Sequence, residues 1–84
     1  MCNEIILDTR ELEAPEPISV VLNNLSNLNK TTSIHMIHRI EPLMLYTHLT
    51  SNNLQYKVVH KDEDVHIYIW TDSYHNKTKI EELN

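Results

Sequence analysis

Two short segments of this sequence bring acids, arginines and a histidine to positions where they could bind a ligand or transfer a proton. Residues 8–16 are acidic with one arginine, and residues 38–41 hold a histidine, an arginine and a glutamate. Carboxylates and imidazole serve general acid–base chemistry and metal binding, whereas guanidinium groups bind anions. The candidate ligand-binding residues are Arg10, Glu11, Glu13, Glu16, His38, Arg39 and Glu41.

Three interpretations of this cluster stay open. In a structural one, Asp8 caps a turn, the acids complement helix N-termini and the arginines pair with the acids. In a binding one, Arg10 or Arg39 and the helix N-termini receive an anion or a partner's carboxylate. In a third, His38 and nearby carboxylates act in catalysis or hold a metal. A metal ion needs several ligands of defined geometry and only one histidine clearly points here, so no metal site is predicted.

The elements that must position these residues follow from the apolar periodicity. Residues 4–8, 33–38, 54–60 and 65–70 are predicted strands, and the polar residues 61–64 make the last two a hairpin. Pro17 begins a helix, and Glu41-Pro42 begins a second one. The second helix is predicted to end at Asn52-Asn53, because the chain has no glycine and asparagine tolerates the left-handed conformation of such turns. The apolar positions of the first helix are Ile18, Val21, Leu22, Leu25 and Leu28, and those of the second are Leu45, Tyr46 and Leu49.

The predicted fold class is α/β, a two-layer sandwich with the order β-α-β-α-β-β. It has a four-stranded mixed sheet with two helices on one face, because a right-handed crossover makes the first two strands parallel and the hairpin is antiparallel. Ligands of open α/β sheets bind at the carboxyl ends of the strands, where both candidate segments meet. Residues 1–84 are predicted to form one domain, with 71–84 a polar tail or a short terminal helix.

The sheet face without helices is the second candidate surface. If Val65, Ile67 and Ile69 face the core, alternation along the strand makes the residues between and after them face outward. These are His66, Tyr68 and Trp70, and Ile37 of the second strand shares their face. We expect this face to bind a protein partner or a second copy of the chain, with acid weakening the contact. In the alternative, the tail from Thr71 folds back over it. The candidate interface residues are Ile37, His66, Tyr68 and Trp70.

The composition excludes several classes of function. Twelve acids against seven bases give a net charge of −5, which disfavours nucleic-acid binding. No apolar run is long enough to span a membrane and no signal peptide is visible, so a cytoplasmic protein is expected. Cys2 is the single cysteine, and the six histidines are scattered, with His35 and His38 on opposite faces of one strand. No cofactor is predicted.

Two motifs resemble those of TusA-like (SirA-like) small proteins. Residues 7–12 read L-D-T-R-E-L and residues 14–17 read A-P-E-P, where the family has L-D-x-x-G-L-x-C-P-x-P at the junction of its first strand and helix. The branch known as domain of unknown function 2249 is more similar, since it shares L-D-x-R-E-L and the later H-x-x-E-P-x-x-L-Y found here at residues 38–46. The resemblance covers about residues 4–70.

The resemblance implies a TusA-like fold and an accessory role in redox or sulfur metabolism. TusA-like proteins carry sulfur as a persulfide on the cysteine that is Ala14 here, and a methyl group cannot carry sulfur. The expected function is therefore a non-enzymatic binding or regulatory module. The alternative is a small enzyme or carrier component that acts on an anionic or sulfur compound through His38 and Arg10.

We predict that the chain forms no stable persulfide at the family position, because Ala14 replaces its cysteine. Incubation with a cysteine desulfurase followed by mass spectrometry tests this. A one-sulfur adduct that persists in a Cys2→Ser variant would contradict it.

Overall fold

The computed structural model describes residues 2–83, so residues 1 and 84 of the predicted domain lie outside the described part. Its centre is a four-stranded sheet with the strand order β1-β2-β4-β3. β1 pairs parallel to β2, and β4 pairs antiparallel to both β2 and β3. The mixed sheet and the closing hairpin are thereby confirmed. The strands are β1 Asn3–Asp8, β2 Thr32–His38, β3 Leu54–Lys61 and β4 Asp64–Thr71.

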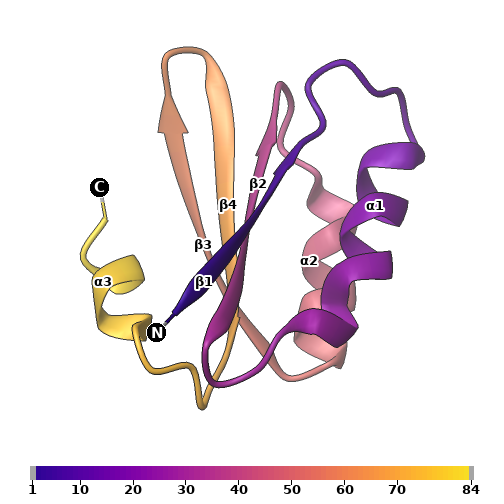
Figure 1. Cartoon of the computed structure of the whole chain (residues 1–84). Helices are drawn as coiled ribbons and strands as arrows, with labels where there is room; N and C mark the ends of the chain where they lie inside the picture. Colours follow the sequence, from indigo (N-terminus) through magenta and orange to yellow (C-terminus); the bar gives the residue numbers. More distant parts are fainter. Residues whose placement is uncertain (1, 84) are drawn as a thin grey trace.

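Two helices, α1 (Glu16–Asn24) and α2 (Leu43–Ser51), cover one face of the sheet (Figure 1). Leu45 and Leu49 of α2 are fully buried, and Tyr46 packs against the same core, as their spacing predicts. The predicted two-layer α/β fold is confirmed. The core between the layers consists of Val21, Ile34, Met36, Leu45, Leu49, Val65, Ile67 and Ile69.

The first helix is shorter than its apolar pattern predicts. α1 ends at Asn24, and a 3-10 turn over Leu25–Asn27 follows, so Leu28 lies beyond the helix. The Asn24 amide donates to the carbonyl of Val20, a side-chain bond to the backbone that competes with continued helix. Leu25 and Leu28 still pack against the core, because an irregular turn can bury apolar side chains as well as a helix does.

The polar tail contains a third helix, α3 (Lys77–Glu81), on the face of the sheet opposite α1 and α2 (Figure 1). Tyr74 and Ile80 of this segment pack against Trp70. Trp70 lies on the predicted face but is only 5% exposed, so the prediction that it is uncovered is wrong. Folding the tail back removes a large aromatic ring from water, which two neighbouring apolar side chains make possible.

Within residues 2–83, three turn residues adopt positive φ, and the sequence has no glycine to take these positions. Asn53 follows α2 with φ 57°, and Asp62 and Glu63 form the β3–β4 turn with φ 52° and 72°. A two-residue hairpin turn with positive φ at both positions has the twist that suits antiparallel strands. Asparagine and aspartate tolerate this region, whereas glutamate does so at a cost.

We predict that Glu63→Gly stabilises the protein by about 0.5–1 kcal/mol, because glycine relieves the positive φ at this position. Urea denaturation followed by circular dichroism measures the change. The control is Gln55→Gly, at an exposed position inside strand β3, which should destabilise. A loss of stability in Glu63→Gly equal to that of the control would contradict the prediction.

Candidate functional site

The parallel pairing of β1 and β2 brings the ends of both strands together at the predicted site. The Thr9 backbone N–H donates to the carbonyl of Ile37 at 2.9 Å, and its hydroxyl donates to the same carbonyl at 2.9 Å. Thr9 is almost fully buried and His38 is 9% exposed. Both lie on the helix side of the sheet, which is the position that alternation predicts for His38.

Hydrogen bonding determines which nitrogen of His38 carries the proton. Nδ1 lies 3.0 Å from the carbonyl oxygen of Thr9 and 3.1 Å from its hydroxyl oxygen. A carbonyl oxygen only accepts, so Nδ1 is the protonated nitrogen and donates to Thr9. In the neutral ring the free electron pair is therefore on Nε2, which is the atom of His38 that can accept a proton or contact a ligand.

A pocket of about 220 Å³ lies beside His38, between the β1–α1 and β2–α2 loops. Its walls are mostly apolar, with His38, Arg39 and two glutamates as the polar groups. It is the size of a single large side chain or a small ligand rather than of a nucleotide. The lining residues are Leu12, Glu13, Ala14, Pro15, Pro17, Ile18, His38, Arg39, Ile40, Glu41 and Pro42.

The charged groups at this pocket are held by bonds within the protein. Arg39 lies 3.7 Å from the Glu13 carboxylate and donates to the carbonyl of Leu12 at 3.4 Å, in an exposed position. Glu41 accepts a hydrogen bond of 3.0 Å from the hydroxyl of Tyr46. Burial, aided by that carboxylate, raises the pKa of Tyr46, so its hydroxyl stays a proton donor at all ordinary pH values.

Arg10 does not line this pocket, although it was predicted to share a rim with His38 and Glu41. Its guanidinium group donates to both carboxylate oxygens of Asp8, at 2.9 and 2.7 Å, and to one carboxylate oxygen of Asp64, at 3.1 Å. Hydrogen bonding to Arg10 lowers the pKa of Asp8 to about 2. Arg10 therefore joins the ends of β1 and β4 and borders a neighbouring depression with Glu11 and Arg39. Glu16 begins α1 and is exposed, outside the residues that line the His38 pocket.

Three exposed apolar side chains in the β2–α2 loop and the first turn of α2 were missed by the sequence analysis. Ile40, Leu43 and Met44 are 69%, 66% and 74% exposed, and Ile40 also lines the pocket. We call them the apolar rim. The signal was present in the sequence, because residues 43–46 are four consecutive apolar residues and a helix turns by about 100° per residue, so one face cannot bury them all.

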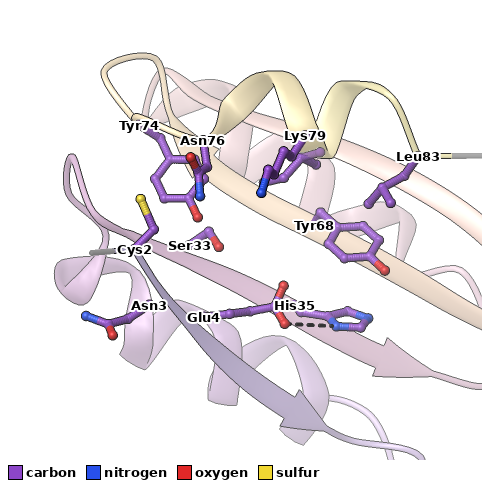
Figure 2. A pocket seen from close by; sticks show the side chains of 11 residues that line it. Cys2, Asn3, Glu4, Ser33, His35, Tyr68, Tyr74, Asn76, Lys79 and Leu83 are labelled. Carbon is purple, nitrogen blue, oxygen red and sulfur yellow. Dashed lines mark ion pairs between the residues drawn. The ribbon is translucent and has the colours of Figure 1, made fainter.

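A second hollow, of about 450 Å³, lies between α3 and the opposite face of the sheet. Figure 2 shows Tyr74, Asn76 and Lys79 from the α3 side above Glu4 and His35 from the strands. His35 stacks on Tyr68, with ring centroids 4.3 Å apart. Beside it, His35 Nε2 lies 2.8 Å from His66 Nδ1.

All four predicted interface residues lie on this face, and Trp70 differs from the others in being covered by the α3 segment. Ile37 is paired with His66, and Tyr68 with His35, so these four side chains point to the same side of the sheet, and each is partly buried. Within residues 2–83 no group of three or more histidine, cysteine or acidic side chains is placed to hold a metal ion. The same residues include no helix of the length and apolar character needed to cross a bilayer.

Comparison of the chain with models of protein families, with curated proteins and with solved structures gave no match.

We predict that neutral His38 is protonated at Nδ1, because the Thr9 carbonyl can only accept. Two-dimensional ¹⁵N–¹H correlation spectra of the imidazole rings above pH 8 report the tautomer directly. A Thr9→Val variant keeps that carbonyl, so the tautomer should persist, while loss of the hydroxyl should cost about 1 kcal/mol of stability. An Nε2-protonated His38 in the wild type would refute the assignment.

Proposed function

We propose that the chain is a non-enzymatic protein-binding module of TusA-like fold that receives an apolar side chain of a partner in the His38 pocket. The observation that carries this proposal is that both sequence motifs line the same pocket. Ala14, Pro15 and Pro17 come from the first motif, and His38, Glu41 and Pro42 from the second. Residues that lie far apart in the sequence thus build one concave surface, as a binding function requires.

The chemistry of the pocket favours binding over catalysis. Its lining side chains include no cysteine, serine, threonine, lysine or tyrosine that could act as a nucleophile. The position where a TusA-like protein would carry sulfur holds the methyl group of Ala14. His38 can accept a proton on Nε2, but an isolated base without a nucleophile to activate supports recognition of a donor more readily than a reaction.

The surroundings of the pocket indicate the chemistry of the partner. The apolar rim of Ile40, Leu43 and Met44 extends the pocket by a hydrophobic surface, which is typical of the anchor region of protein interfaces. Glu11 and Glu13 in the adjoining loop and Glu16 at the start of α1 are exposed. Because these acids outnumber Arg39 and the whole chain has a net charge of −5, a partner segment with one apolar anchor and flanking basic residues fits best.

The alternative, a small enzyme or carrier that acts on an anionic compound through His38 and Arg10, has weaker support. Two carboxylates already bind the guanidinium group of Arg10, and Arg10 and His38 border different depressions. An anion would have to displace these carboxylates and approach an acidic loop. We place the module in the cytoplasm and, through the TusA-like resemblance, near redox or sulfur metabolism.

We predict that peptides selected by the wild-type protein from a random display library share an apolar anchor and basic residues. Leu43→Ser should weaken binding of such a peptide at least 10-fold in fluorescence polarisation, because it removes an apolar contact at the rim. Serine is well tolerated in the first turn of a helix, so α2 should form normally. Raising the salt concentration should also weaken binding.

The matched control is Ile6→Ser, which alters an equally exposed isoleucine on the opposite face of the sheet. Its affinity should equal that of the wild type. In a Cys2→Ser background, Ala14→Cys adds a single thiol in the pocket, and the bound peptide should slow its alkylation. Loss of binding in Ile6→Ser with retention in Leu43→Ser would place binding on the open face and contradict the proposal.

A further inference from the structure

The imidazole rings of His35 and His66 contact each other on the open face of the sheet, with ring centroids 5.1 Å apart. His35 also lines the hollow beneath α3 (Figure 2). His35 Nε2 and His66 Nδ1 are 2.8 Å apart, so one of them donates a proton to the other. We propose that this pair is an acid-sensitive latch, which holds α3 over Trp70 while the pair carries at most one added proton and releases it when both rings are charged.

The neighbouring carboxylate determines the direction of the hydrogen bond. Glu4 Oε1 lies 3.7 Å from His35 Nδ1, which favours a proton on that nitrogen. His35 Nε2 is then the acceptor and His66 Nδ1–H the donor, which leaves the electron pair of His66 on Nε2. Glu4 thus favours a proton on His35 Nδ1 across 3.7 Å, and His66 donates to His35 in the hydrogen bond between the rings.

The first and second added protons have different structural consequences. The first can enter at His66 Nε2, and the charged ring still donates from Nδ1 to His35. The second must enter at His35 Nε2, which is the acceptor of the bond between the rings. Two N–H groups and two positive charges would then face each other across 2.8 Å, so the rings must separate.

The environment of His35 opposes that second proton at neutral pH. Burial, the largest cause, lowers the pKa of His35, and the nearby His66 lowers it further, while Glu4 acts in the opposite direction. The unfolded chain therefore binds more protons at His35 than the folded one as the pH falls. By linkage, this contribution to stability is present above the ordinary histidine pKa and is lost as the pH falls through the depressed value.

The stacking partner of His35 couples the pair to α3. Tyr68 stacks on His35 and also packs against the cluster of Trp70, Tyr74 and Ile80. When the two histidines separate, the His35 ring moves away and its stacking contact with Tyr68 is lost. A charged His35 would also lie in the same hollow as the Lys79 ammonium group of α3, which adds repulsion between the sheet and the helix.

Among the elements next to the pair, α3 has the fewest anchors. It is five residues long and buries only Ile80. Lys57 Nζ donates to the carbonyl of Glu81, and the His75 N–H, ahead of the helix, donates to the carbonyl of Lys30. A short terminal element with so few contacts opens at a lower free energy than the core. The charged or titratable groups that share the face or the hollow are Cys2, Glu4, Asp8, Arg10, Lys57, Lys61, Asp64, Tyr68, Tyr74 and Lys79.

The protonation steps can be measured by NMR titration of the imidazole resonances from pH 8 to pH 4. The wild type should show two coupled steps separated by at least about one pH unit, since strongly interacting sites titrate as a pair. In His66→Asn, the amide nitrogen can donate to His35 while His35 is neutral. When His35 is charged, the amide can rotate so that its oxygen accepts from His35. His35 should then titrate in one step at a higher pH than in the wild type.

Trp70, the single tryptophan, reports the position of α3. Its emission should shift to longer wavelength with the second protonation step in the wild type and should not shift in His66→Asn. The control His60→Asn alters an exposed histidine on the opposite face of β3 and should behave as the wild type. Ile80→Ser should show the shifted emission already at neutral pH, which calibrates the open state.

Three results would overturn the latch. The first is an emission shift of the same size in His66→Asn and in the wild type. The second is a second protonation step with no change at Trp70. The third is a shift that coincides with loss of the far-ultraviolet circular dichroism of the sheet, which would assign the change to unfolding of the whole domain. The test does not depend on the His38 pocket, so its outcome is independent of the proposed function.

Discussion

The parallel pairing of β1 with β2 is the constraint on which the candidate site depends. The register aligns Asp8 with Ile37, so the next residue on each strand, Thr9 and His38, meet at the end of the ladder. Thr9 makes several hydrogen bonds there. Its N–H and its hydroxyl donate to the carbonyl of Ile37, and its own carbonyl accepts from the Leu12 N–H and from His38. These bonds fix the start of the β1–α1 loop and the imidazole ring at the same time. A shift of the register by one residue would turn His38 to the open face and remove the pocket.

The walls of the pocket follow from two crossover connections, α1 from β1 to β2, which this pairing requires, and α2 from β2 to β3 on the far side of β4. A parallel pair cannot be joined by a tight turn, so the chain must leave β1, cross as α1 and return. Both α1 and α2 then begin at the same edge of the sheet, and each begins next to a proline, Pro17 in the first turn of α1 and Pro42 before α2. Prolines are suited to these positions because they donate no hydrogen bond, and their rings contribute apolar walls. The concave surface is therefore a product of topology, and His38, Arg39 and the two glutamates are the polar side chains placed on it.

The sequence predicts those parts of the structure that depend on local periodicity. Alternation in residues 33–38 and 65–70 assigns each side chain of β2 and β4 to a face, and the observed pairing of Ile37 with His66 agrees with it. Contacts between distant segments escape the same reasoning. The Asp64 carboxylate that binds Arg10 comes from the far end of the chain, and no local pattern indicates that Tyr74 and Ile80 cover Trp70. The apolar rim was only partly predictable. The sequence shows more apolar residues in α2 than one face can bury, but it does not indicate that Leu43 and Met44 are the exposed ones.

The two candidate devices lie on opposite faces of one rigid strand, and this has a mechanistic consequence. His38 points to the helix layer from β2, whereas His35, three residues earlier, points to the open face. Ile34 and Met36, on either side of His35 in the sequence, are fully buried and hold β2 in the sheet, where it has a strand on either side. In the proposed latch, a charged His35 would therefore displace Tyr68 and α3 while the backbone that positions His38 stays in place. With both proposals together, the sheet would separate an acid-sensitive face from a binding face, and release of α3 would leave the His38 pocket intact.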